Sequence, residues 1–391
     1  MLEFHSDLEF DPTRDADFFS ALPHFPAICL IEPRDPKADP YLIRTQDLRR
    51  RLQRLLGPLD RTSKRLNLRD FARKVHYRVT PSAFEQALAY YEHAKLRFPK
   101  KYRAMMRLRP PAVLKVNLRN AYPRCYATRR IPVDASGNPT GGSYYGPFPS
   151  RRAADAFAER VLDLFKVRRC QIKIRRDPSY PGCIYSEMKM CLAPCFGGCT
   201  KEEYDAEVSR LVQFLETGGT SLRTAHEAER DKASEDLDFE RASALHKKLE
   251  KIDDALRGQP ELPRRVQDLS LVIFQRASAD QTVAVFPVFA GRLSEPFFLS
   301  FSQLAGDPRS AEQLLRDRLE TSTADSSADL GEHLWLVARW FYSNPRQGEI
   351  FFREKTWPYR RMMRACARLL APPGAEPPLA KNDTTGEPRT S

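Results

Sequence analysis

The chain has 391 residues, enough for two or three domains with a sizeable core. Its 64 Lys and Arg residues outnumber 51 Asp and Glu residues, which gives a formal net charge of +13 at pH 7. No run of 18 or more apolar residues occurs, so we do not expect a membrane span. The start MLEFHSDLEFDPTRD lacks the basic and apolar segments of an export signal, so we expect a cytoplasmic protein with reduced thiols.

The N-terminal part of the sequence predicts an arm followed by a small α/β domain. Residues 1–24 carry mixed charge with little periodicity, which is typical of an arm. Apolar stretches at 26–32 and 41–44 predict two short strands. A helix is expected over 45–56, with four leucines on one face and arginines on the other. We place the α/β domain at residues 25–110.

Positive charge is concentrated in this first part of the chain. Between Arg44 and Lys115 there are 20 Lys and Arg residues against five Asp and Glu residues. Such an excess favours binding to a polyanion, of which nucleic acid is the usual one, although a solvated basic face is the alternative. The cations that we expect to contact DNA are Arg44, Arg49, Arg50, Arg54, Lys100, Lys101 and Arg103.

Residues 111–205 predict a region of strands and helices around a group of cysteines. The alternation of Leu114, Val116 and Leu118 is typical of a half-buried strand, and PRCYATRRI predicts a second one. Ser150 is a candidate N-cap for the helix that follows. Its C-terminal end carries three cations that would offset the negative charge of thiolates nearby: Lys166, Arg168 and Arg169.

Five of the eight cysteines fall within 30 residues, at Cys170, Cys183, Cys191, Cys195 and Cys199. Clustered thiols in a reducing compartment favour metal binding, although reduced structural cysteines are the alternative. No histidine lies in this stretch, and all-thiolate sites select zinc or an iron–sulfur cluster. Structural zinc usually takes two close cysteine pairs, whereas here one tight group faces two single cysteines, which weakens the case for zinc.

The rest of the sequence predicts a helical region and then an α+β domain. Thr200 and Glu203 form a capping-box pattern, and helices are expected over 206–260. From 269 to 301 the apolar pattern changes to period two, which predicts an antiparallel meander, and helices follow within a domain at 264–370. Residues 371–391 are rich in proline and polar residues, as in disordered tails. The fold class expected for the whole chain is therefore α+β.

Three segments in this order resemble a known family: YYGPFPS, LFKVRRC and CIYSEMKMCLAPC. The order is similar to the central region of the C subunit of bacterial excinuclease ABC, the nuclease of nucleotide-excision repair. The resemblance implies a [4Fe-4S] cluster on Cys170, Cys183, Cys191 and Cys195, with Cys199 as an extra thiol. Zinc stays the alternative, because spacing alone does not separate the two.

The same resemblance places a GIY-YIG nuclease domain in the N-terminal part, with several departures from the family pattern. The motifs fall on residues 27–29 and 41–43, where both glycines and the first tyrosine are missing. The catalytic arginine corresponds to Arg51, but the metal-binding glutamate corresponds to Tyr90, whose neutral phenol cannot replace a carboxylate. Glu85 and Glu92 are rotated off the helix face of Tyr90. We expect Tyr41 and Arg51 to be remnants of a site that no longer cuts, with Mg²⁺ bound only if the nuclease is active.

A second match covers ASEDLDFERASALHKKLEKI, which resembles the UVR motif through which the B and C subunits of this family bind each other. A generic antiparallel helical pair is the alternative. The resemblance implies that Phe239, Leu245 and Leu249 contact the B subunit, another UVR-motif protein or a second copy of this chain. We expect the family's RNase H-like nuclease domain and its helix-hairpin-helix pair to be absent.

These observations support three hypotheses about function. The first is a DNA-binding protein in or around nucleotide-excision repair, without nuclease activity of its own. The second is a working Mg²⁺-dependent endonuclease that makes one incision. The third is a DNA-binding regulator that responds to the redox state of an iron–sulfur cluster.

Overall fold

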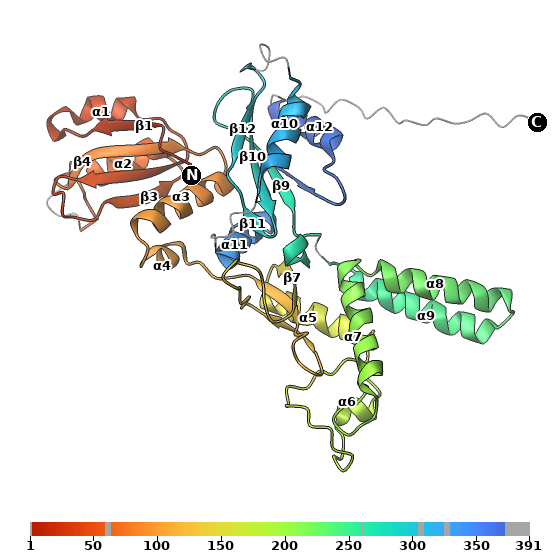
Figure 1. Ribbon diagram of the computed structural model, residues 1–391. Coiled ribbons are helices and arrows are strands. Elements are labelled where there is room, and N and C mark those ends of the chain that lie inside the picture. Colours follow the sequence, from red (N-terminus) through yellow and green to blue (C-terminus); the bar gives the residue numbers. More distant parts are fainter. Residues whose placement is uncertain (1, 59–63, 260, 304–308, 324–328, 372–391) are drawn as a thin grey trace, which may run out of the picture.

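A computed structural model describes residues 2–58, 64–259, 261–303, 309–323 and 329–371. The predicted disordered tail lies outside the described residues, apart from Ala371. Helices and strands alternate along the chain in an α+β arrangement, as the sequence predicts (Figure 1). No helix of the described residues is long and apolar enough to cross a membrane.

The N-terminal domain is built on a four-stranded antiparallel sheet in the order β1-β4-β2-β3. Alternate residues of β2 face opposite sides, so Cys29 and Ile31 pack under α1 and α2 while Ile28 and Leu30 pack under α3. The elements are β1 (Ser6–Glu9), η1 (Pro12–Arg14), α1 (Asp15–Ala21), β2 (Ala27–Pro33), β3 (Tyr41–Thr45), α2 (Leu48–Leu56), β4 (Ala72–Val79), α3 (Ala83–Arg97) and α4 (Tyr102–Met106).

The prediction of an N-terminal arm is wrong. Strand β1 pairs with β4, and Phe18 and Leu22 of the α1 region are buried in the core beneath α2. The sequence pattern is weak here because β1 lies at the edge of the sheet, where its side chains alternate between half-buried and exposed. These residues therefore belong to the domain itself.

The middle domain has a sheet in the order β6-β5-β7-β8, in which β8 returns from a point more than 100 residues further along the chain. One face is covered by α5, whose Phe157 and Val161 pack with Leu114 and Val116 of β5. The elements are β5 (Ala112–Val116), β6 (Cys125–Thr128), β7 (Ser143–Phe148), α5 (Arg151–Leu162), α6 (Ile184–Glu187), α7 (Lys201–Glu216) and β8 (Arg264–Arg265).

Two predicted helix starts are confirmed at the atomic level. The Ser150 side chain accepts a hydrogen bond from the backbone N–H of Ala153 at the start of α5. Thr200 and Glu203 form a reciprocal capping box at the start of α7. The predicted boundary at 205/206 falls inside α7, whose Tyr204, Val208 and Leu211 complete the middle-domain core, so α7 belongs to that domain.

Helices α8 (Thr220–Glu235) and α9 (Phe239–Leu256) form an antiparallel hairpin that projects from the body of the molecule (Figure 1). Its base is anchored to the middle domain, because Ile252 of α9 joins the core beneath α5 and Arg160 donates to the carbonyl of Ala255. The hairpin tip lies far from this anchor.

The C-terminal domain is a five-stranded antiparallel sheet between helices. Strands β9, β10 and β12 form the predicted meander, and β13 adds to the free edge of β9. Helices α10 and α12 cover one face and α11 covers the other. The elements are η2 (Val266–Asp268), β9 (Leu271–Arg276), β10 (Thr282–Phe289), β11 (Arg292–Leu293), β12 (Phe297–Ser300), α10 (Ala311–Thr321), α11 (Leu330–Phe341), β13 (Glu349–Phe352) and α12 (Tyr359–Leu370).

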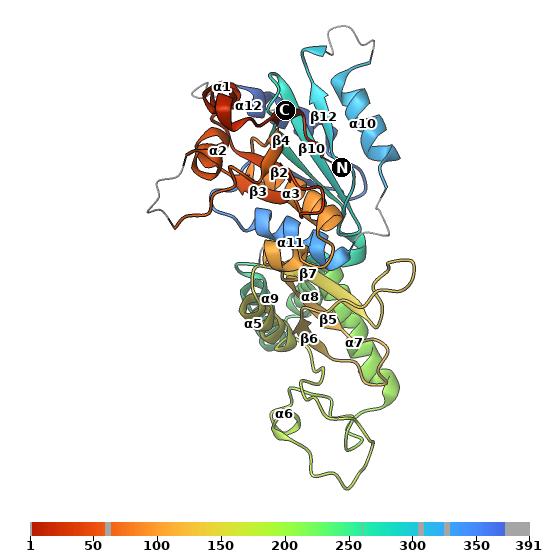
Figure 2. The ribbon, with the colours of Figure 1, turned by 90° about the vertical axis from the view of Figure 1, so that its left-hand side faces the viewer.

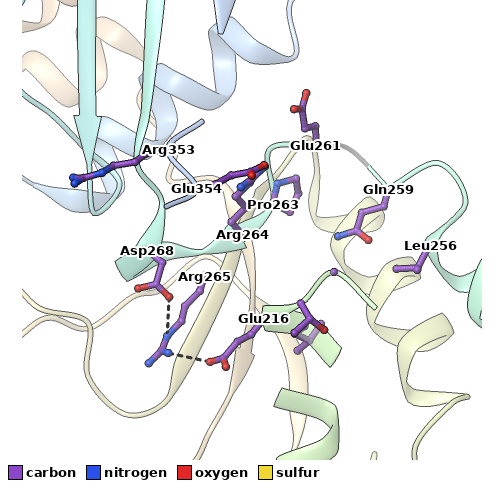
Figure 3. A pocket seen from close by; sticks show the side chains of 13 residues that line it. Glu216, Leu256, Gln259, Glu261, Pro263, Arg264, Arg265, Asp268, Arg353 and Glu354 are labelled. Atoms are coloured by element: carbon purple, nitrogen blue, oxygen red, sulfur yellow. Dashed lines mark hydrogen bonds and ion pairs between the residues drawn. The ribbon is translucent and has the colours of Figure 1, made fainter. Parts of the chain in front are cut away.

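The first and last domains share one hydrophobic core, although they are far apart in the sequence. Phe84 of α3 packs edge-on against Phe286 of β10, with ring centroids 5.1 Å apart, and also contacts Trp340 of α11. The middle domain and hairpin meet this body at a cavity of about 790 Å³, where Arg265 pairs with Glu216 and Asp268 (Figure 3). Both views place α6 at the end of the molecule opposite α10 and α12 (Figure 2).

Candidate cluster site and nucleic-acid surface

The clustered cysteines lie in the connection between α5 and α7. This connection has little regular structure apart from the single turn of α6, which begins directly after Cys183. Its two ends are fixed by the middle-domain core, since Val167 and Tyr204 are fully buried there. The long loop is thus held at both ends by the sheet and by α7.

The structure brings the four predicted ligand cysteines around one small cavity. Cys170, Cys183, Cys191 and Cys195 all line a space of about 150 Å³, whereas Cys199 does not. Cys199 is instead buried in the middle-domain core. The four thiols come from points up to 25 residues apart, so tertiary folding of the loop gathers them. No carboxylate and no imidazole lines this cavity.

Two hydrogen-bond donors already point at the sulfurs. The backbone N–H of Ala193 donates to Cys191 Sγ at 3.3 Å, and Arg168 Nη1 lies 3.7 Å from Cys170 Sγ. The Arg168 guanidinium is held in place by the carbonyls of Tyr122, Cys170 and Ile172. Both donors would stabilise negative charge on a sulfur.

Burial acts against thiolate formation in the absence of a ligand. It raises the pKa of Cys191 to about 11, and it also raises the pKa of Cys195. A coordinated metal deprotonates its thiol ligands outright, so the two effects oppose each other. Among the described residues, no three His, Cys, Asp or Glu side chains are grouped tightly enough to be assigned to a single metal ion.

The predicted remnants of a nuclease site come from different elements of the N-terminal domain. Tyr41 on β3 packs at the core under α2, whereas Tyr90 on α3 is buried in the opposite core. Arg44 lies over the Tyr90 ring at 5.4 Å, and burial raises the pKa of this phenol. Arg51 is half-buried on α2, and no hydrogen bond joins it to Tyr41 in the part of the chain that the structure describes.

Both carboxylates near Tyr90 are engaged elsewhere. Glu85 is buried and accepts two hydrogen bonds from Arg78, at 2.9 and 3.1 Å. Glu92 accepts from the backbone N–H of Leu2 at 2.7 Å. One oxygen of each carboxylate is therefore already engaged, which leaves neither side chain a ready substitute for the missing metal ligand.

Some of the cations predicted to bind DNA hold the fold together instead. Arg49 donates to the carbonyls of Ser20 and Leu22 at the end of α1. Arg103 pairs with Glu332 and Asp329 of the α11 region, at 2.7 and 3.0 Å. Lys101 forms an exposed pair with Asp39. The predicted cations that stay exposed without a carboxylate partner among the described residues are Arg44, Arg50, Arg54 and Lys100.

Of the three hairpin residues that the sequence predicts to contact a partner, Phe239 alone is exposed. Phe239 is 68% exposed at the tip, and the neighbouring Leu237, which the sequence analysis missed, is 71% exposed. Leu245 and Leu249 are only 3% and 7% exposed because they pack inside the hairpin and at its base, so they cannot contact a partner. The signal for Leu237 is an apolar residue between acidic residues at the turn between two helices.

Comparison with known proteins identifies the middle domain. The family model of the UvrC/Cho excinuclease middle domain matches residues 112–214, which include β5, α5, most of α7 and all four cysteines of the cavity. The chain is related to UvrABC system protein C. The family model begins at residue 112, so the GIY-YIG-like identity of the N-terminal domain stays a prediction.

Curated relatives extend this match over about half of the chain. UvrABC system protein C of Ruminiclostridium cellulolyticum is 31% identical over 182 residues, which is 46% of this chain and 28% of the relative. The UvrC proteins of Desulforudis audaxviator and Corynebacterium jeikeium are 28% and 26% identical over 61% and 65% of this chain, and over 38% and 36% of their own lengths. The chain thus spans well under half the length of these relatives. No solved structure matches it.

Proposed function

We propose that this UvrC-related chain is a cytoplasmic DNA-binding protein of nucleotide-excision repair that carries a metal cluster and does not cut DNA. The observation that carries the proposal is the match to the UvrC middle domain over residues 112–214, within which four separated cysteines line one cavity. The relatives that match are named as parts of the UvrABC system.

The cofactor proposed is a [4Fe-4S] cluster on Cys170, Cys183, Cys191 and Cys195. Four thiols with no carboxylate or imidazole among them, the guanidinium of Arg168 and the amide of Ala193 fit an anionic iron–sulfur group. When bound, such a cluster supplies structural cross-links and a site for electron exchange. The protein's own part is to hold the four thiols and to offset their charge through Arg168. Zinc is the competing occupant.

Elemental analysis of anaerobically purified protein tests this cofactor. We expect iron and sulfide in the wild type, their loss in Cys191→Ser, and their retention in Cys199→Ser, whose thiol lies outside the cavity. Cys191→Ser should also lower the unfolding temperature, because metal binding is coupled to folding. Stoichiometric zinc without iron would overturn the cluster in favour of zinc, and equal iron loss in both variants would overturn the ligand assignment.

The N-terminal domain is proposed to bind DNA without cleaving it. Arg44, Arg50, Arg54 and Lys100 keep exposed charge, while Tyr90 is buried at the position where a carboxylate would bind Mg²⁺ and both nearby glutamates are engaged. We expect binding that weakens steeply with salt and no nicking of plasmid DNA with Mg²⁺ or Mn²⁺. Arg51→Ala should weaken binding only modestly. Metal-dependent nicking that Arg51→Ala abolishes would instead establish the working endonuclease.

A comparison of two redox states of the cluster tests the hypothesis of a redox-responsive regulator. DNA affinity is compared between protein with the cluster oxidised and protein with the cluster reduced, in the same buffer and salt. Equal affinities assign the cluster a structural role, whereas a clear difference makes the protein a redox-responsive regulator.

The hairpin tip is proposed to bind the B subunit of the excinuclease, through a UVR-type helical hairpin on the partner. Leu237 and Phe239 form an exposed apolar pair on a segment that projects from the body (Figure 1). Phe239→Ala should cost about 2 kcal/mol or more of binding free energy. Phe25→Ala is the matched control, because Phe25 is also exposed but lies in the N-terminal domain. An equal effect of both variants, or self-association in place of B-subunit binding, would reject this partner.

A further inference from the structure

The middle-domain sheet has a second face that α5 does not cover. Along β5 and β6, Leu114 and Cys125 point into the core with α5, so Lys115, Arg124 and Tyr126 stand on the opposite face. Lys115 lies directly opposite Tyr126 in the register of the two strands and opposite Tyr144 on the other side. Cations and tyrosines therefore form a cross-strand row on this face.

This face is one wall of an open cavity of about 690 Å³. The other walls come from the loop between β5 and β6 and from the segment that follows Cys170. We call it the basic groove, and its lining comprises Lys115, Asn117, Arg119, Asn120, Ala121, Tyr122, Arg124, Tyr126, Gly141, Arg168, Gln171, Ile172, Lys173 and Ile174. Five of these residues are cations and none is a carboxylate.

Four of the five cations keep their charge free for a ligand. In the part of the chain that the structure describes, no carboxylate lies within ion-pair distance of Lys115, Arg119, Arg124 or Lys173. By contrast, the cavity of Figure 3 is lined by arginines and carboxylates together, and Arg265 pairs with Glu216 there. The charge of the basic groove is thus unbalanced, which costs free energy through mutual repulsion unless an anion binds.

Aromatic rings and a buried arginine hold these cations in place. The Arg124 guanidinium lies 4.3 Å from the centroid of the Tyr126 ring, and the Lys115 ammonium lies 5.2 Å from that of Tyr144. Arg168 donates to the carbonyls of Tyr122 and Ile172, and so joins two walls of the basic groove. Gly141 has φ +84°, and a Cβ there would stand 3.2 Å from Lys115 Nζ, so this position leaves the lysine room.

We propose that the basic groove binds the sugar–phosphate backbone of DNA, as a surface separate from the N-terminal domain. The choice of DNA rests on the proposed function. A row of unpaired cations fits a polymer of phosphates, and the half-buried Tyr122 and Tyr126 line the groove beside these cations. A small-molecule site would have a mostly apolar lining, which the basic groove lacks.

The basic groove lies next to the cavity that the four cysteines line. Lys173 lies three residues after Cys170, and Arg168 contacts both the Cys170 sulfur and the groove wall at Tyr122. DNA in the basic groove would therefore lie beside the cavity that the four cysteines line.

A charge-reversal pair tests the proposal on the full chain. Arg119→Glu with Lys173→Glu changes two exposed cations of the basic groove, and Lys355→Glu with Arg361→Glu is the matched control on the C-terminal domain, with the same change in net charge. Binding is measured by fluorescence anisotropy with duplex DNA, single-stranded DNA and RNA of the same sequence, over a range of salt. Thermal unfolding checks that both variants fold, and Arg119→Ala with Lys173→Ala is a milder second pair.

We expect the groove pair to weaken DNA binding by about tenfold or more and to lower the slope of log affinity against log salt by about two, while the control stays near the wild type. The measurements with duplex and with single-stranded DNA show which form of DNA the basic groove prefers. A further pair, Arg50→Glu with Arg54→Glu, changes two exposed cations of the N-terminal domain. If this pair weakens DNA binding while the groove pair binds DNA as tightly as the control pair does, the basic groove is rejected as a DNA-binding surface and the proposed function is not. A wild-type chain that binds no DNA overturns the proposed function as well, and tighter binding of RNA overturns the choice of DNA.

Discussion

The hydroxyl of Tyr91 donates to Glu332 Oε2 at 2.7 Å, across 241 residues of sequence, and both groups are buried. Tyr102 and Arg103 donate to the other carboxylate oxygen, each at 2.7 Å. Burial alone would raise the pKa of Glu332, but these hydrogen bonds outweigh it and lower the pKa. The contact fixes helix α11 of the last domain against α3 and α4 of the first.

Removing the charge at Glu332 should therefore destabilise the whole body of the molecule. We expect Glu332→Gln to lower the free energy of unfolding by roughly 1–3 kcal/mol, because the amide keeps one accepting oxygen but turns an N–H donor toward groups that themselves donate, while the Arg103 side chain is largely exposed. Glu312→Gln is the control, since its pair with Arg316 on α10 is exposed and contributes at most about 1 kcal/mol. Urea unfolding of the two variants gives the comparison, and equal losses would show that the buried network does not stabilise the domain contact.

Acid should weaken the fold through the buried His333. Burial, with Lys95 as the second cause, lowers the pKa of His333 from 6.5 to about 4, and its Nδ1 accepts from the backbone N–H of Leu293. Between these two pH values the unfolded chain binds a proton that the folded chain does not, so stability falls as the pH falls. His333→Gln should flatten the dependence of unfolding free energy on pH between 6.5 and 4. An unchanged slope would mean that other groups carry it.

Two substitutions in the hairpin should affect stability differently, because one removes a buried side chain and the other an exposed one. Leu245→Ala removes a buried side chain and should cost about 2–5 kcal/mol of folding free energy. Phe239→Ala removes an exposed one and should change stability by less than about 0.5 kcal/mol. Thermal unfolding of both variants checks this, and a large loss in Phe239→Ala would mean that the phenylalanine packs within its own chain.

Gly142 is required where β7 begins beside β5. Its φ is +149°, and a Cβ there would stand 2.1 Å from the carbonyl oxygen of Val116, so the two strands would have to move apart. Gly218 is the control, because it has φ +59° with no atom within 4 Å of its Cβ position. Gly218→Ala should cost about 1–2 kcal/mol from backbone strain alone. Gly142→Ala should cost clearly more in the same unfolding assay, and equal costs would contradict the steric argument.

Local patterns in the sequence predict the elements well wherever one face is buried. Leu48, Leu52 and Leu55 fall on the core side of α2, and the period-two segments become β9, β10 and β12. Ser150 and Thr200 cap their helices because a cap depends on residues only three apart. Edge strand β1 was missed, because its partner β4 is more than 60 residues away and its own alternation is weak.

For the candidate site, too, the sequence predicted some features and missed others. The cysteine series and the hairpin were visible as ordered residue patterns, and the structure gathers Cys170, Cys183, Cys191 and Cys195 around one cavity. The sequence pattern did not show which cations are available to bind DNA. Counting charge selected Arg49 and Arg103, which bind carbonyls and carboxylates of the fold, and passed over Arg119, Arg124 and Lys173.

The sequence alone therefore determined most of the helices and strands, the series of clustered cysteines and the helical hairpin, since each depends on neighbouring residues. Only the tertiary structure decided which side chains remain free. Leu245 and Leu249 are buried by the packing of α9, while Phe239 at the tip stays exposed. Arg103 is neutralised by Glu332, more than 200 residues away, whereas the cations of the basic groove meet no carboxylate among the described residues. Pairing and burial depend on contacts between distant segments, which a local pattern does not contain.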